Sequence, residues 1–116
     1  GNTSIGDNVV IGQSVEVKNS IIGSNSFISH LSCVGDSIIG DDVNFGAGTM
    51  VSNFRHDGLN HRSMIDGELI DTGRQKFGTI IADGVRTGIN TSIYPGRKIG
   101  GNSYTKPAEV VHLDLY

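Results

Sequence analysis

His30 is the residue of this sequence whose type and position best suit acid–base chemistry. It lies in the segment FISHLSCVGD, where the surrounding repeat has no need of an ionisable side chain. Histidine titrates near neutral pH, so its imidazole can take a proton from a reacting group and return it. A single histidine is more often structural or merely exposed, and the residue types alone leave both interpretations open.

A second feature suited to chemistry is the run Gly46-Ala47-Gly48. With glycine on both sides, a backbone N–H, that of Ala47, could face a reacting carbonyl and stabilise an oxyanion. The same glycines equally suit an ordinary turn. The sequence therefore offers a base and a candidate oxyanion donor, and the elements around them must bring the two together.

The residues around His30 carry a repeat that could do this. Apolar side chains recur every five or six positions, and most of them are followed by glycine. The recurring residues are Ile22, Ile28, Val34, Ile39, Phe45 and Val51. Their spacing fits neither the helical period nor the alternation of a long strand, and it is typical of the hexapeptide repeat of a parallel β-helix.

The repeat closes a circuit every 17 residues, from Ile5 to Ile22 to Ile39. Late in the chain the spacing is a constant six, which gives circuits of 18 residues through Ile81, Thr87, Ile93, Ile99, Thr105 and Val111. These counts predict a three-sided prism, with aliphatic side chains stacked inside and backbones paired about 4.8 Å apart. Spacing alone does not fix the hand of the coil.

Residues 55–78 interrupt the repeat. They are polar and charged, and no apolar residue recurs at the interval of six. Long irregular segments in compact domains are usually functional or disordered. The segment MIDGELIDT has an Asp-Gly pair suited to a tight turn, which predicts a small hairpin. We therefore expect an all-β solenoid with a hairpin excursion at about residues 55–78.

The composition sets the remaining limits. The chain has 116 residues, 17 glycines, a net charge of -3 and one cysteine, Cys33, which excludes an internal disulfide. An acidic balance argues against nucleic acid or an anionic membrane as the main partner. No apolar run approaches the roughly 20 residues of a membrane span, and no signal peptide opens the chain. We expect one soluble, cytoplasmic domain, residues 1–116, that is part of a longer protein because the repeat runs to both ends.

Five segments together resemble one enzyme family. They are VEVKNSIIG (residues 15–23), SHLSCVGDSIIGDDVNFGAGT (residues 29–49), SNFRHDG (residues 52–58), DTGRQKFGTII (residues 71–81) and RTGINTSIYPGRKIG (residues 86–100). Across nearly the whole chain the sequence resembles the acetyltransferase domain of bifunctional N-acetylglucosamine-1-phosphate uridyltransferase/glucosamine-1-phosphate acetyltransferases. It is most similar to the archaeal sugar-1-phosphate nucleotidylyltransferase/acetyltransferases.

The resemblance implies a left-handed β-helix that forms a homotrimer, with the nucleotidylyltransferase domain absent from this sequence. It implies transfer of the acetyl group of acetyl-CoA to the amine of glucosamine 1-phosphate or galactosamine 1-phosphate, in UDP-N-acetylglucosamine biosynthesis, with no metal in this domain.

The same resemblance assigns roles to individual residues. The catalytic group would be His30 as base, Asn53 polarising the amine through its carbonyl, and Ala47 as oxyanion donor. The sugar phosphate would be bound by Lys18, Asn44, Arg74 and Lys76. The phosphates of coenzyme A could be bound by basic residues in the last third of the chain, namely Arg86, Arg97, Lys98 and Lys106. Without the resemblance, the asparagines would be read as turn residues and the cations as solvated surface charge.

Two positions depart from the family. Cys33 and Phe54 stand where bacterial members carry tyrosine, so a hydroxyl contact to the sugar phosphate is missing. Arg55, Arg74 or Lys76 in the excursion could replace it.

Two other functions remain open. Three histidines, His30, His56 and His61, could bind zinc as in hexapeptide carbonic anhydrases, although the last two lie in the excursion. Alternatively, the coils could be a non-catalytic scaffold that trimerises a nucleotidylyltransferase domain. The presence of His30, Asn44, Asn53 and Lys76 together favours an enzyme.

Overall fold

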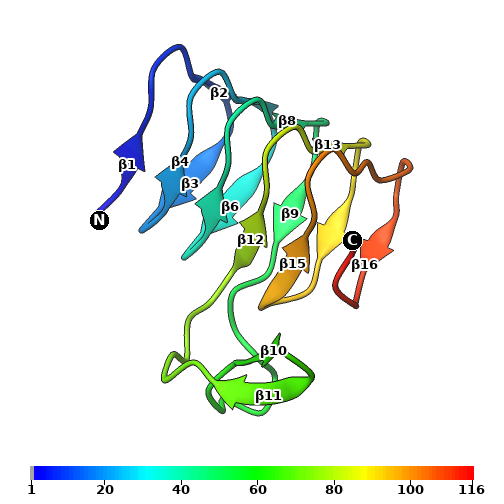
Figure 1. Ribbon diagram of the computed structural model, residues 1–116. Coiled ribbons are helices and arrows are strands. Elements are labelled where there is room, and N and C mark those ends of the chain that lie inside the picture. The colour runs from blue at the N-terminus through cyan, green and yellow to red at the C-terminus, as the bar shows by residue number, and fades with distance from the viewer. Residues whose placement is uncertain (1) are drawn as a thin grey trace.

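The computed structural model describes residues 2–116, and these residues form short strands with no helix among them. The strands build three parallel sheets that run side by side along one axis (Figure 1). Each of the first four circuits contributes one strand to each sheet in turn, and the last contributes strands to two of them. The chain winds as a left-handed solenoid, so the expected parallel β-helix is confirmed.

We name the sheets by their strands. Sheet A contains β1 (Ser4–Ile5), β4 (Ile21–Ile22), β7 (Ile38–Ile39), β12 (Thr79–Ile81) and β15 (Arg97–Ile99). Sheet B contains β2 (Val10–Gln13), β5 (Phe27–His30), β8 (Asn44–Phe45) and β13 (Arg86–Thr87). Sheet C contains β3 (Glu16–Lys18), β6 (Cys33–Gly35), β9 (Met50–Val51), β14 (Ser92–Ile93) and β16 (Val110–Val111).

The strand register confirms the predicted circuits. Ile5 pairs with Ile22 and Ile22 pairs with Ile39, which are steps of 17 residues. The next step in sheet A, from Ile39 to Ile81, is 42 residues because the excursion intervenes. Ile81 then pairs with Ile99, a step of 18.

The predicted inward positions form the core. Ile22, Ile28, Val34, Ile39, Phe45, Val51, Ile81, Ile93, Ile99 and Val111 are all buried. Burial of each such side chain stabilises the fold by about 1.5–3 kcal/mol. Thr87 and Thr105 replace aliphatics in sheet B and pair their hydroxyls, each at 2.7 Å, with those of Thr49 and Thr91. In the first circuit of the described residues, the inward positions Ile5 and Ile11 are exposed.

Glycines follow the inward residues because neighbouring coils approach closely there. A Cβ on Gly23 would lie 2.7 Å from the Gly40 carbonyl oxygen, closer than any side chain can be accommodated. Positive φ angles occur elsewhere in the turns, chiefly at asparagine and aspartate such as Asn25 and Asp42. Close approach of the backbones, and not a left-handed conformation, therefore explains Gly23.

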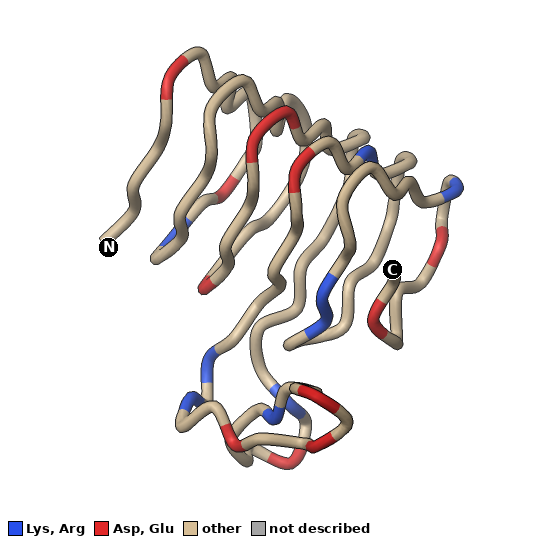
Figure 2. Tube along the Cα trace, viewed as in Figure 1, with Lys and Arg blue, Asp and Glu red and all other residues tan. Residues whose placement is uncertain are grey.

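The excursion leaves the prism after β9 and carries the predicted hairpin. Strands β10 (Arg62–Ile65) and β11 (Glu68–Asp71) pair antiparallel around an Asp66-Gly67 turn with positive φ at both residues. An antiparallel bridge between Phe54 and Lys76 joins the two ends of the excursion beside the prism. Many charged residues of both signs gather on it (Figure 2). No helix among residues 2–116 is long and apolar enough to cross a membrane.

Candidate active site

A column of polar residues marks the corner between sheets C and A. Asn19, Asp36 and Asn53 follow one another at steps of 17 residues and therefore lie on successive coils. Asp36 Oδ1 accepts a hydrogen bond from Asn19 Nδ2 at 2.7 Å, and Asp36 Oδ2 accepts one from Asn53 Nδ2 at 2.8 Å. An ionised carboxylate has no hydrogen to donate, so each amide must turn its NH₂ group toward Asp36. The carbonyl oxygen of Asn53 is thereby turned away from Asp36.

Cations of the predicted phosphate-binding group surround the same carboxylate. Arg74 Nη2 lies 3.9 Å from Asp36 Oδ1, and the Asp36 side chain is only 8% exposed. Burial opposes ionisation of Asp36, but hydrogen bonds from Asn19 and Asn53 and the charges of Arg74 and Lys18 hold its pKa below the usual value. Asp36 is therefore ionised across the physiological pH range.

Lys18 and Asn53 converge over Gly35. A Cβ added at Gly35 would lie 3.2 Å from Lys18 Cε and 3.2 Å from Asn53 Nδ2. A side chain at position 35 would therefore occupy the space between Lys18 and Asn53 that glycine leaves open. The fold brings Lys18, Asn53 and Arg74 together around Asp36, although they come from two circuits of the solenoid and from the excursion.

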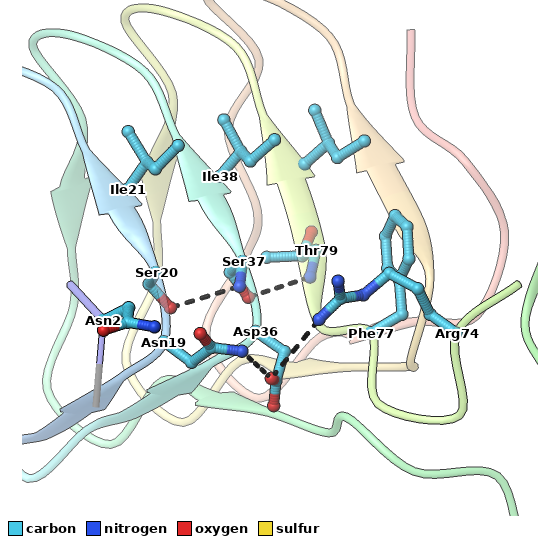
Figure 3. A pocket seen from close by; sticks show the side chains of 11 residues that line it. Asn2, Asn19, Ser20, Ile21, Asp36, Ser37, Ile38, Arg74, Phe77 and Thr79 are labelled. Carbon is cyan, nitrogen blue, oxygen red and sulfur yellow. Dashed lines mark hydrogen bonds and ion pairs between the residues drawn. The ribbon is translucent and has the colours of Figure 1, made fainter. Parts of the chain in front are cut away.

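A cavity of about 280 Å³ opens on the sheet A side of this corner. Asn19, Asp36, Arg74 and Phe77 line its mouth together with isoleucines of sheet A (Figure 3). Behind them the hydroxyls of Ser20 and Ser37 accept hydrogen bonds from the backbone of the next coil. The Asp36 carboxylate points between Asn19 and Arg74 (Figure 3).

His30 lies at a different corner, between sheets B and C. It ends β5, and its side chain is exposed. Its carbonyl oxygen accepts hydrogen bonds from Ser32 Oγ at 2.9 Å and Gly48 N at 3.2 Å, which fix the backbone. Ala47 occupies the equivalent position one circuit later. Among residues 2–116 no hydrogen bond engages the Ala47 N–H, so an N–H without a partner lies one coil from His30.

The short strand β6 separates these two corners. Cys33 lies between Glu16 and Met50 on the outer surface of sheet C, with Gly35 about 7 Å further along the strand. Burial, followed by the charge of Glu16, raises the pKa of the Cys33 thiol, while Lys18 lowers it. The thiol therefore stays protonated at neutral pH. A ligand lying over Cys33 would have His30 at one end and Lys18 with Asn53 at the other.

The remaining predicted residues are spread over other surfaces. Asn44 and Arg86 pair in register on the outside of sheet B, and exposed Lys106 lies beside Gly88 on the same face of the prism, outside the strands of that sheet. Lys76 Nζ lies 4.9 Å from the centre of the Phe54 ring. Lys98 Nζ donates to the Met64 carbonyl oxygen at 2.5 Å and joins the hairpin to the prism. The structure thus groups some of the predicted residues but does not bring all of them together within one chain.

Comparison with known proteins places the chain in a family. Residues 1–106 match the family model of the GMPPB C-terminal domain. The chain belongs to this family.

Two sequence relatives of the chain are named as bifunctional proteins, and the name of the first states both activities. The chain is 50% identical over 105 residues to a bifunctional sugar-1-phosphate nucleotidylyltransferase/acetyltransferase of Sulfurisphaera tokodaii, covering 90% of this chain and 26% of that protein. It is 47% identical over 114 residues to the bifunctional protein GlmU of Methanococcus vannielii, covering 98% and 27%. The chain spans about a quarter of the length of these curated relatives. The resemblance expected from the motifs is confirmed.

A solved structure supports the fold. A hexapeptide-repeat-containing acetyltransferase from Vibrio cholerae, complexed with acetyl coenzyme A, superposes with a TM-score of 0.54 at 22% identity. The match covers 95% of this chain and 60% of that one. At this identity the likeness concerns the architecture of the solenoid alone.

Asp36 and Asn19 are the site residues that the motifs missed. Their signal was present, because Asn19, Asp36 and Asn53 recur at the length of one circuit. Residues at such spacing stack on one corner of a solenoid. Asn44 lies in strand β8 and Asn53 at the corner after β9, and neither has the positive φ that favours asparagine in a left-handed turn.

The histidines proposed for zinc do not meet. His30 ends β5, whereas His61 is buried in the excursion with Nε2 2.9 Å from the Gln75 carbonyl oxygen. Within residues 2–116 no three His, Cys, Asp or Glu side chains are placed to bind a metal ion together. The carbonic-anhydrase alternative gains no support from this geometry.

Proposed function

We propose that residues 1–116 form an acetyltransferase domain that moves the acetyl group of acetyl-CoA to the amine of an amino-sugar 1-phosphate. The observation that carries the proposal is the arrangement across sheet C: His30 and Ala47 at one corner, Lys18 and the Asp36-oriented Asn53 at the other. The names of the curated relatives support the reaction class. Nucleotidyl transfer would belong to a part of the protein outside this chain.

The proposed chemistry is attack of a neutral amine on a thioester. The nitrogen lone pair forms a C–N bond with the acetyl carbonyl carbon, and the resulting oxyanion accepts a hydrogen bond from the Ala47 N–H. His30 takes the proton that the nitrogen loses. When the C–S bond breaks, that proton passes to the departing thiolate of coenzyme A, which leaves His30 neutral for the next cycle.

Asn53 would orient the amine. Its NH₂ group is held by Asp36 at 2.8 Å, so its carbonyl oxygen can accept an N–H of the substrate. Lys18, Arg74 and Lys76 would bind the phosphate. The 3.9 Å separation between Arg74 and Asp36 is longer than a hydrogen bond, and the Arg74 side chain is 53% exposed. Arg74 Nε donates to the Lys76 carbonyl oxygen at 3.1 Å, so turning Arg74 toward a phosphate would exchange that hydrogen bond for one to the phosphate.

A homotrimer would bring the remaining residues to the site. Asn44, Arg86 and Lys106 lie on the sheet B face of the prism, whereas Lys18 and Cys33 lie on sheet C. We propose that sheet B of one copy faces sheet C of its neighbour and supplies contacts to sugar and coenzyme A. Mixed trimers of His30→Ala and Asn44→Ala chains should then recover part of the activity that each variant lacks alone.

The test is thiol release from acetyl-CoA in the presence of glucosamine 1-phosphate, galactosamine 1-phosphate or no sugar. We expect release that depends on the sugar, and the better substrate of the two names the epimer. If a trimeric sample released no thiol with either sugar, the proposal would fail and a trimerising scaffold would be the better account.

A further inference from the structure

A second cavity lies where the excursion folds against the C-terminal coils. Its volume is about 240 Å³. We call it the hairpin pocket and define it by Arg55, His61, Arg62, Tyr94, Arg97 and His112. The first three residues come from the excursion, and the last three come from sheets C and A. The pocket thus exists only because residues 55–78 leave the solenoid.

The hairpin pocket is strongly basic in a chain whose net charge is -3. Three arginines and two histidines line it, and no carboxylate does. Arg55 has a partner outside the lining, since its Nη2 pairs with Asp57 Oδ2 at 2.5 Å. Neither Arg62 nor Arg97 has an ion-pair partner among residues 2–116. Guanidinium groups gathered in one cavity repel unless an anion lies between them.

Arg97 lines the pocket with a guanidinium whose hydrogen bonds are incomplete. Its Nε is buried and has no hydrogen-bond partner, the only such side-chain atom among residues 2–116. A buried N–H without an acceptor is costly, and native structures rarely keep one without a reason. A guanidinium beside other arginines is the arrangement that binds the oxygens of a phosphate.

The pocket lies along the line that an acyl thioester would follow. Lys18, Gly35, Ser52, Tyr94 and His112 occupy one outer column of sheet C on successive coils. His30 belongs to the same circuit as Gly35, two to three coils before the pocket. At about 4.8 Å a coil, and allowing for the width of the sheet, the separation is roughly 15 Å. A pantetheine arm has the length of about four extended residues, roughly 14 Å.

We propose that the hairpin pocket binds a phosphate group, and that coenzyme A bound with its thioester at His30 would place its diphosphate there. The inference rests on the proposed function for the source of the phosphate but not for the site itself. A sugar 1-phosphate carries the same chemical group, and binding experiments separate the two sources.

The experiment is isothermal titration calorimetry of the protein with coenzyme A, pantetheine, glucosamine 1-phosphate and inorganic phosphate. Variants Arg97→Gln and Arg62→Gln remove one guanidinium each. His56→Gln changes an exposed residue of the same excursion that does not line the pocket and serves as the control. Melting temperatures identify variants that fail to fold, and Arg62, being exposed, is the safer of the two.

We expect each arginine variant to weaken coenzyme A binding about tenfold or more and to leave pantetheine binding unchanged. His56→Gln should bind all four ligands as the unchanged protein does. If the arginine variants lost affinity only for glucosamine 1-phosphate, the pocket would still be a phosphate site, and its ligand would be the sugar phosphate. If folded variants bound every phosphate ligand as tightly as the unchanged protein, the inference would be overturned.

Acetyl-transfer kinetics separate failure of this inference from failure of the proposed function. Pocket variants should raise KM for acetyl-CoA and leave kcat nearly unchanged at saturation. Full activity with an unchanged KM for acetyl-CoA would refute the phosphate site in the hairpin pocket but leave the proposed acetyltransferase function intact. If the protein bound phosphate but transferred no acetyl group, the phosphate site would stand and the proposed function would be refuted.

Discussion

The solenoid and the excursion of residues 55–78 position their side chains by different means. In the solenoid, each residue is placed by its neighbours one circuit before and after, and the inward side chains from the second circuit onward are buried. In the excursion, strand β11 is exposed along its whole length, and a few contacts to the prism hold the hairpin in place. The solenoid therefore provides a rigid frame, and the excursion adds cations that its repeat cannot place there.

This difference matters because the Asp36 end of the candidate active site and the hairpin pocket both lie where the two regions meet. Arg74 of the excursion reaches Asp36 of the solenoid, and Arg62 reaches the coils that carry Arg97 and His112. Segments with few buried apolar contacts open more easily than a packed core. We expect ligand binding to depend on the excursion and global stability to depend on the solenoid.

The largest effect should come from a charge placed in the solenoid core. Ile39 is 1% exposed, so Ile39→Asp would bury an unpaired carboxylate and lower the free energy of unfolding by about 3–5 kcal/mol. Its neighbour Ile38 is 48% exposed and points outward, so Ile38→Asp should cost less than about 1 kcal/mol. Thermal denaturation compares the two, and equal melting temperatures would contradict the inward and outward assignment.

Asp36→Asn should have the next largest effect and links the two regions directly. The substitution introduces an NH₂ group opposite Asn19 and Asn53, removes the charge that faces Arg74, and leaves the Asn53 amide free to flip. We expect kcat/KM for acetyl transfer to fall about 10- to 100-fold and stability to fall by about 1–3 kcal/mol. Asp42→Asn, at an exposed turn, is the control. Equal losses of kcat/KM and stability in the two variants would contradict the proposal that Asp36 orients Asn53.

Asp36 should also leave a signature in the pH dependence of stability. Its folded-state pKa lies below the ordinary aspartate value, so the unfolded chain binds the proton more readily. Its contribution is then fully present above the unfolded pKa of about 3.9 and is lost as the pH falls through the folded pKa. Urea denaturation from pH 6 downward should show a steeper loss of stability for the unchanged protein than for Asp36→Asn. Parallel curves would contradict the shift.

The smallest effect should be local and confined to the excursion. Lys98 Nζ donates to the Met64 carbonyl oxygen, and Lys98→Met would remove that link at a cost of about 1 kcal/mol. Amide hydrogen exchange in β10 and β11 should speed up about fivefold, with exchange in the core strands unchanged. Lys106→Met, at an exposed lysine on the sheet B face of the prism, should leave the hairpin as it was. Uniformly faster exchange in all strands would mean that the two regions open as one unit.

The periodic part of the structure was predictable, and the aperiodic part was predictable only in outline. Six-residue spacing specifies which side chains enter the lumen, because each coil repeats the geometry of the last; Ile22, Ile39 and Ile81 illustrate this. The Asp-Gly turn at Asp66-Gly67 specified the hairpin for a local reason. Nothing local specifies where the hairpin packs, so the contacts of Lys98 with Met64 and of Arg74 with Asp36 could not be predicted.

The candidate site was predictable where it follows the repeat. His30 and Ala47 meet because they are one circuit apart, and the same rule would have revealed the Asp36 column. The hairpin pocket escaped prediction because its residues come from distant segments with no shared period.

The central claim is that His30 is the base of an acetyl transfer on the outer surface of sheet C. Its most direct test is the turnover of His30→Ala beside Gln13→Ala, since Gln13 pairs in register with His30 one circuit earlier and is also exposed. We predict that His30→Ala lowers kcat about 10²- to 10⁴-fold while Gln13→Ala stays near the unchanged protein. A folded His30→Ala protein with full turnover would contradict the account.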